Sequence, residues 1–221
     1  MNIDNISTVL TVRKGSERVK NKNLKPFYQK NLLAYKIETL LKVKSIKKII
    51  VNTDSEEAIK IANEYGVSHH RREAYYASSE CPNSEFWCHI AENTKTEYIL
   101  FTHCTNPLIK VDTYEKMIEI FYKEKNKFDS FNSVTEVKEF LILQNKPLNF
   151  EFSKAPNSQN LPDVIKLNFA INILSTSLMK KKKSLIGDNP FFYKINEIES
   201  FDINTINDFE FAEYLFKNRK N

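Results

Sequence analysis

The chain has 221 residues, 41% of them hydrophobic and 28% charged, which fits a globular domain that buries a full core. No apolar run approaches the ~20 residues that a membrane-spanning helix needs, and no signal peptide precedes the first strand, so we expect a cytoplasmic protein. The net charge of +5 suits nucleic acid, an anionic membrane surface or a small phosphorylated substrate. Because no nucleic-acid-binding motif is present, the small anion is favoured.

A basic loop follows the first predicted strand. Residues 6–12 form an apolar run typical of a buried strand, and the periodicity of residues 32–41 indicates a helix. The loop between them carries five cations: Arg13, Lys14, Arg18, Lys20 and Lys22. A strand that opens into such a loop ahead of a helix is suited to holding phosphates, because backbone N–H groups can turn inward and cations neutralise the charge. The alternative is a solvated basic turn.

The loop lacks two common nucleotide-binding motifs. It has no Gly-Lys-Ser/Thr of a Walker loop, and it has one glycine, too few for the dinucleotide fingerprint. Its pattern instead resembles the nucleotide loop of the CMP-sialic acid synthetase family of cytidylyltransferases. The matching residues are Arg13, Gly15, Ser16, Lys22 and Asn23. The resemblance implies that Arg13 and Lys22 stabilise the triphosphate and the departing pyrophosphate, while Gly15, Ser16 and Asn23 bind the nucleotide.

Strands and helices alternate after this loop. The predicted elements are a helix over 32–44 with Asn31 as N-cap, a buried strand over 47–52 and a helix over 56–65 that stops at Gly66. This rhythm implies right-handed crossovers and a parallel sheet. Ligands of such sheets gather beyond the carboxyl ends of the strands, so we expect Arg13 and Asp54 to share one rim.

Two further residues are candidates for contacting the base. Residues 50–57 resemble the second strand–helix unit of the same family. Beyond this unit, Arg72 stands where the family places an arginine against the cytosine ring, and Ser84 falls near a family serine that contacts cytidine. Outside this context Arg72 would be interpreted as an exposed loop arginine, since most arginines are exposed.

The strand predicted over residues 97–102 ends at His103. The following segment resembles the family's Gln-Pro-Thr-Ser-Pro-Leu and retains Thr105 and Pro107. His103 replaces the glutamine that helps bind the sugar in sialic acid enzymes. At a strand end His103 can titrate near neutrality and act as an acid or base, or it can donate a hydrogen bond to the acceptor.

The three cysteines form no recognisable framework. Cys81, Cys88 and Cys104 are odd in number and irregularly spaced, which argues against a set of disulfides. Cys88 and Cys104 each adjoin a histidine. Without a Cys-x-x-Cys pair or a second matched cluster, we expect no zinc site.

The periodic pattern breaks in the second half of the chain. Residues 113–125 predict an amphipathic helix and residues 128–137 a strand. About residues 139–165 then carry three prolines and no clear periodicity. In the family this region forms an arm that exchanges with a second subunit, so the resemblance implies a dimerisation excursion and a homodimer. The alternative is an ordinary surface insertion.

Residues 166–174 predict another strand, which resembles the family's Asn-Gly-Ala-Ile-Tyr-Ile segment. The resemblance places Asn168 at the acceptor. Ser158 stands where a family arginine contacts the sugar acid, which weakens the case for the usual pose of a sialic acid carboxylate. Lys166 or His103 could take over that contact.

Asp202 and Asn204 match the family's Asp-Ile-Asp-Thr segment, with the second aspartate replaced by asparagine. Residues two positions apart on an extended segment project to the same side and can share a divalent cation through oxygen ligands. The resemblance therefore implies Mg²⁺ (or Mn²⁺) held by Asp202 and Asn204, although a neutral amide holds the metal less well. The alternative is that Asp202 is a cap or turn residue.

The resemblance extends from residue 6 to residue 215 and implies a single domain over 1–221. We expect an α/β three-layer Rossmann-like nucleotidyltransferase fold with a mostly parallel sheet. The implied reaction joins CMP from CTP to a nonulosonic (sialic-type) acid for bacterial surface-glycan synthesis and releases pyrophosphate. One alternative is a cytidylyltransferase that makes a CDP-linked product from a phosphorylated acceptor. Another is a catalytically weak nucleotide-binding protein.

Overall fold

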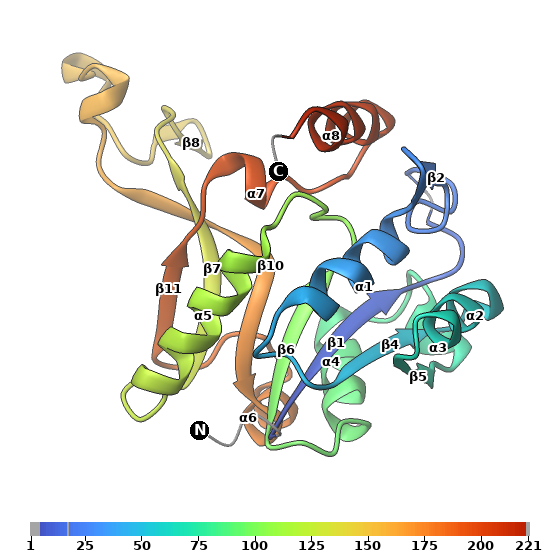
Figure 1. Cartoon of the computed structure of the whole chain (residues 1–221). Coiled ribbons are helices and arrows are strands. Elements are labelled where there is room, and N and C mark those ends of the chain that lie inside the picture. Colours follow the sequence, from blue (N-terminus) through green and yellow to red (C-terminus); the bar gives the residue numbers. More distant parts are fainter. Residues whose placement is uncertain (1–4, 17, 220–221) are drawn as a thin grey trace.

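A seven-stranded sheet forms the centre of the computed structural model, which describes residues 5–16 and 18–219 (Figure 1). The strands lie in the order β11-β7-β10-β6-β1-β4-β5. Their bounds are β1 Ile6–Val12, β4 Ile49–Thr53, β5 Ser68–Arg71, β6 Tyr98–His103, β7 Ser130–Val137, β10 Val164–Ser175 and β11 Pro190–Lys194. Strand β10 runs antiparallel to β6 and β7, whereas the other pairings described within this sheet are parallel. The prediction of a mostly parallel sheet is confirmed.

Helices cover both faces of this sheet. Their bounds are α1 Leu32–Lys42, α2 Glu56–Glu64, α3 Ala74–Ala77, α4 Asn83–Glu92, α5 Val111–Glu124, α6 Thr176–Lys182, α7 Glu197–Ser200 and α8 Ile206–Asn218. On one face, buried side chains of α1, α2, α5 and α8 join Leu10 of β1 in the larger core. On the other face, α4 and α6 pack against Val9. Because consecutive residues of a strand point to opposite faces, a strand covered on both sides places apolar residues such as Val9 and Leu10 on both faces. The three-layer α/β fold is therefore confirmed.

Local signals explain where the first helices begin and end. Asn31 is the N-cap of α1, and its side chain accepts a hydrogen bond of 2.9 Å from the backbone N–H of Ala34. Ser55 caps α2 in the same way through Ala58. Gly66 follows α2 with a φ of +67°, a left-handed conformation that favours glycine after a helix.

Among the described elements that were not predicted are β5, β11 and α3. Strand β5 is an edge strand of sequence Ser-His-His-Arg, in which polar side chains are mostly exposed and give no apolar signal. Strand β11 pairs in parallel with β7 at the other edge. Helix α3 spans four residues, too few to produce a helical period. Each element is stabilised by its neighbours rather than by its own pattern.

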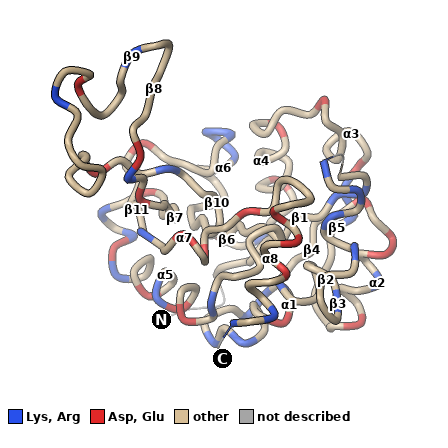
Figure 2. The backbone as a smooth tube through the Cα atoms, turned by 90° about the horizontal axis from the view of Figure 1, so that it is seen from above, with Lys and Arg blue, Asp and Glu red and all other residues tan. Residues whose placement is uncertain are grey.

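The region after β7 projects from the sheet, and its role in dimerisation stays a prediction. It contains the hairpin of β8 (Ile142–Leu143) and β9 (Lys146–Pro147), then the 3₁₀ turns η2 (Phe152–Lys154) and η3 (Ser158–Asn160). Figures 1 and 2 show this excursion extending away from the β7 and β11 side of the molecule, opposite β5. Near the nucleotide loop, a second small hairpin joins β2 (Pro26–Phe27) to β3 (Lys30–Asn31). Among the described helices none is both long enough and apolar enough to cross a membrane.

Candidate active site

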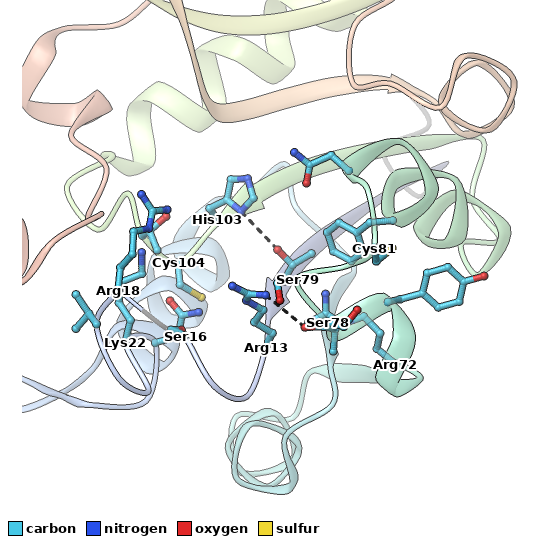
Figure 3. A pocket seen from close by; sticks show the side chains of 18 residues that line it. Arg13, Ser16, Arg18, Lys22, Arg72, Ser78, Ser79, Cys81, His103 and Cys104 are labelled. Atoms are coloured by element: carbon cyan, nitrogen blue, oxygen red, sulfur yellow. Dashed lines mark hydrogen bonds between the residues drawn. The ribbon is translucent and has the colours of Figure 1, made fainter.

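A cavity of about 480 Å³ opens at the carboxyl ends of β1 and β6, beside the loop that follows β1. Six of the predicted site residues line it: Arg13, Ser16, Lys22, Asn23, Arg72 and His103. Figure 3 shows Arg13 between Lys22 and Arg18 on one side and Arg72 on the other. The cavity lies where ligands of parallel sheets gather.

The basic loop is divided between the cavity and solvent. Arg13, Arg18 and Lys22 line the cavity, whereas Lys14 and Lys20 are exposed and outside it. Within the described residues, none of the three lining cations forms an ion pair. Three cations at one cavity without carboxylate contacts are suited to binding a polyanion, which favours the phosphate-binding hypothesis over the solvated turn.

The backbone of the loop is fixed by its neighbours. The N–H of Lys14 donates a 2.8 Å hydrogen bond to Oδ1 of Asp54, which confirms that the ends of β1 and β4 share one rim. Gly15 does not line the cavity, but its φ of +79° is a left-handed conformation that side chains disfavour. Gly15 therefore shapes the turn that carries the lining cations.

Lys22 lies where the loop meets the segment before α8. Its Nζ donates a hydrogen bond to the backbone oxygen of Ile203. Burial lowers the pKa of Lys22, Arg18 and Arg13 lower it further, and Asp202 and Asp208 oppose the shift. The cation thus lies between the cavity and the segment of Asp202.

Arg72 is a buried residue, contrary to the alternative of an exposed loop arginine. Its side chain is 5% exposed, its Nη2 donates a 2.5 Å hydrogen bond to the backbone oxygen of Val12, and its guanidinium lies 4.8 Å from the ring centre of Phe86. Burial lowers the pKa of Arg72 to about 10, with Asp54 opposing the shift, so the side chain stays charged at neutral pH.

Two buried polar atoms at the cavity lack a hydrogen-bond partner among the described residues. They are Nε of Arg72 and Oδ1 of Asn23, one donor and one acceptor. Buried polar groups are nearly always paired in folded proteins, so each of these atoms is suited to a bound ligand. A pyrimidine base offers both acceptors and donors at its edge.

His103 ends β6 and is half-buried. Its Nδ1 lies 3.5 Å from Oγ1 of Thr11, and its ring meets Phe101 edge-on. Burial lowers the pKa of His103 to about 4; Asp202 opposes this shift, whereas the cations of Lys36 and Lys22 add to it. The imidazole is therefore neutral at pH 7, which favours the hydrogen-bonding role over titration near neutrality.

Asp202 and Asn204 lie between α7 and α8, outside the cavity lining. The amide Nδ2 of Asn204 donates a 2.8 Å hydrogen bond to Oδ2 of Asp202, so the two side chains do project to the same side. Thr205 and Asp208 form the capping box of α8, so Asp202 is not the helix cap. An oxygen-rich pair of one carboxylate and one amide fits Mg²⁺, which uses one or two carboxylates together with water and substrate phosphates.

The acceptor residues predicted on β10 do not line the cavity. The side chain of Asn168 bonds to Ser133, Thr135 and the N–H of Ala170, and so holds the bulge at Phe169, where φ is +51°. Lys166 is exposed on the same strand. Their roles at the acceptor stay predictions.

Ser84 lies in the first turn of α4, and the neighbouring Asn83 and Phe86 line the cavity in its place. The cavity is also lined by residues outside the predicted site set: Thr11, Arg18, Val19, Tyr76, Ala77, Ser78, Ser79, Cys81, Cys104 and Thr105. Arg18 was counted among the five cations of the basic loop, and Thr11 could have been found because it stands near the end of β1. Tyr76 gave no such signal, because α3 is short; its ring stacks on His89 at 3.8 Å.

A family model described as cytidylyltransferase matches residues 8–166. The chain is 26% identical over 230 residues to the post-translational flagellin modification protein B of Campylobacter coli, covering 97% of this chain and 96% of that protein. It is 25% identical over 232 residues to the CMP-N,N'-diacetyllegionaminic acid synthase of Campylobacter jejuni, covering 95% of this chain and 94% of that protein. A solved CMP:2-keto-3-deoxy-manno-octonic acid synthetase complexed with CTP has a TM-score of 0.73 at 12% identity, covering 96% of this chain and 98% of that one.

Proposed function

Because the chain belongs to the cytidylyltransferase family, we propose that it transfers CMP from CTP to a nonulosonic (sialic-type) acid and releases pyrophosphate. The observation that carries this proposal is the cavity that collects Arg13, Arg18 and Lys22 beside the buried Arg72. The relative from Campylobacter jejuni is named for a legionaminic acid, which is an acceptor of this class. Bacterial surface-glycan synthesis is the process that such a product serves.

The cations act on the phosphates of CTP. Arg13, Arg18 and Lys22 neutralise the triphosphate, so that the acceptor oxygen can approach the α-phosphorus in line. The new bond joins that oxygen to the α-phosphorus, and the bond from the α-phosphorus to the oxygen bridging to the β-phosphate breaks. The negative charge that develops on the departing pyrophosphate is stabilised by the same cations. No covalent enzyme intermediate is needed.

The nucleoside occupies the Arg72 side of the cavity. The unpaired Nε of Arg72 donates to the base, and Oδ1 of Asn23 accepts from it. Ser16 lines the same cavity, while Ser84 acts from the adjacent turn of α4. His103, neutral at pH 7, forms a hydrogen bond with the acceptor.

Asp202 and Asn204 are the residues that would hold Mg²⁺ (or Mn²⁺). When bound, the metal would neutralise charge on the α-phosphate oxygens. The hydrogen bond between Asp202 and Asn204 uses one carboxylate oxygen and the amide nitrogen, which leaves an oxygen on each side chain for a metal. The pair carries one negative charge, whereas two aspartates would carry two.

Pyrophosphate release from CTP and Mg²⁺ tests this proposal against a panel of acceptors. The panel contains sialic, legionaminic and pseudaminic acids together with several sugar and polyol phosphates. Release with a nonulosonic acid supports the proposal. Release with phosphorylated acceptors alone would assign the enzyme to CDP-linked products, and CTP binding without turnover would leave a nucleotide-binding protein. A cytoplasmic location stays a prediction.

A further inference from the structure

A lysine lies buried under the active site. Lys36 of α1 is 2% exposed, yet no carboxylate among the described residues pairs with it. Its Nζ lies 2.7 Å from the backbone oxygen of Asn106 and 3.1 Å from the hydroxyl oxygen of Tyr114. Burying an amine without a counter-charge lowers the free energy of unfolding, so the presence of Lys36 in the core calls for a role that offsets this cost.

The direction of each hydrogen bond around Lys36 follows from its neighbours. The hydroxyl of Thr102 donates to the backbone oxygen of Ala170 at 2.7 Å, so it accepts from Tyr114 at 2.8 Å. The hydroxyl of Tyr114 has then used its proton and can only accept from Lys36. Lys36 is therefore the donor in both of its hydrogen bonds, and Asn106 is its backbone acceptor.

Asn106 is also hydrogen-bonded to the segment that carries Asp202. Its Nδ2 donates to the backbone oxygens of Ser200 at 3.2 Å and Phe201 at 3.3 Å. In parallel, the N–H of Ile203 donates a 2.9 Å hydrogen bond to the backbone oxygen of Thr105. The turn after β6 and the segment before α8 are thus joined at both residues of the turn.

We propose that Lys36 is a positioning residue, which fixes the turn at Thr105 and Asn106 and thereby sets the place of Asp202 beside the cavity. The role of Asp202 rests on the proposed function, whereas the positioning itself is a property of the fold. The lysine side chain has about the same volume as methionine, so a methionine would fill nearly the same space without bonding Asn106.

Three variants separate positioning from general stability. Lys36→Met removes the hydrogen bonds and keeps the volume. Tyr114→Phe changes an equally buried position but leaves the hydrogen bond from Lys36 to Asn106 intact. Lys42→Met makes the same substitution at an exposed position of α1.

Amide hydrogen exchange provides a readout that needs no ligand. In Lys36→Met we expect the Ile203 amide to exchange about tenfold faster, the effect of losing one typical hydrogen bond, while core amides of β6 are unaffected. We expect the urea midpoint to stay unchanged or to rise, because a buried polar group is replaced by an apolar one. Tyr114→Phe and Lys42→Met should leave Ile203 protected. Unchanged protection of Ile203 in Lys36→Met, or a uniform loss of protection over the whole core, would overturn the proposal.

Turnover supplies the second readout. If the enzyme makes the CMP product, Lys36→Met should need about tenfold more Mg²⁺ for half-maximal rate, since one displaced ligand weakens a metal site to this extent, with the KM for CTP at saturating Mg²⁺ within about twofold. An unchanged Mg²⁺ requirement would contradict the link to Asp202. Absence of turnover in the wild type would refute the proposed function, and the exchange result would still decide whether Lys36 positions the segment.

Discussion

At the scale of the residue, the site combines one buried cation, Arg72, with three cations that are half-buried or exposed at the cavity: Arg13, Arg18 and Lys22. The backbone bond of Arg72 to Val12 and its contact with Phe86 hold the guanidinium at the cavity. Asn23 is buried at the same cavity with one oxygen unpaired among the residues described. Preorganised groups of this kind cost no reordering when the ligand binds.

The base-binding role of Arg72 can be tested beside a matched neighbour. We expect Arg72→Lys to raise the KM for CTP about 10- to 100-fold with little change in kcat, because lysine lacks the planar fork of donors. Arg71→Lys, an exposed residue that pairs with Glu56, should behave as the wild type. Steady-state kinetics with varied CTP measures both variants, and equal effects at the two positions would contradict the assignment.

The metal pair can be tested by restoring a second carboxylate. Asn204→Asp replaces the hydrogen bond to Asp202 with repulsion, which a divalent cation relieves. We expect the Mg²⁺ concentration for half-maximal rate to fall about 10-fold, and the metal-free protein to be slightly less stable. Asn207→Asp adds the same charge at an exposed position of α8 and serves as the control. A Mg²⁺ requirement equal to that of the control would exclude Asn204 as a ligand.

At the scale of the element, helix α1 carries one buried lysine, Lys36, and one exposed lysine, Lys42. Lys36 would be assigned to solvent by its residue type, since lysine is almost never fully buried without a partner. It lies instead under the turn after β6, where Tyr114, Cys104 and His103 are among the titratable groups around it. The helical period predicts α1 but does not identify which polar residue faces the core.

Burial of Lys36 predicts a pH dependence of stability. Burial lowers its pKa from 10.5 to about 7, so between these values the unfolded chain binds more protons than the folded one. The free energy of unfolding should then rise with pH over this window, relative to Lys36→Met, by up to about 1 kcal/mol per pH unit, and the slope should fade below about pH 6, where both states are protonated. Urea denaturation of both proteins at pH 6, 7, 8 and 9 gives the difference directly. Parallel stability curves would show that Lys36 is not buried as an uncharged amine.

Sequence patterns predict some elements and not others, for physical reasons. β1 and β6 are apolar because helices cover both faces, and this made them recognisable. Strands β5 and β11 lie at the sheet edges, where partial exposure removes the pattern. The pairing of Asp202 with Asn204 followed from the period of two in an extended segment. Lining residues from α3 had no comparable signal.

At the scale of the whole molecule, the excursion after β7 exposes large apolar side chains. They are Phe140, Ile142, Leu143, Leu148 and Phe152, the last 68% exposed. Phe140, Phe150 and Phe152 form a row of ring contacts. An exposed apolar cluster on a projecting arm is typical of an interaction surface, and we propose a second copy of the chain as its partner.

The homodimer is tested by a single exposed ring. We expect Phe152→Ser to shift the protein from dimer to monomer at micromolar concentration, because losing a buried aromatic weakens an interface about 10- to 100-fold. Phe192→Ser removes an exposed aromatic from β11, outside the excursion, and should leave the mass unchanged. Light scattering after gel filtration measures both. A wild type that is monomeric, or a dimer that withstands Phe152→Ser, would contradict this role of the excursion.

The central claim is that the cavity beside β1 transfers CMP to a nonulosonic acid. The most direct measurement is a ³¹P NMR time course of CTP, Mg²⁺ and legionaminic acid with the wild type and with Arg13→Gln. We expect CTP signals to give way to one phosphodiester signal and pyrophosphate in equal amounts, at a rate at least about 100-fold lower in Arg13→Gln, as for the loss of one charge-stabilising group. A wild type that converts no acceptor of the class, or an Arg13→Gln variant that is equally fast, would contradict the account.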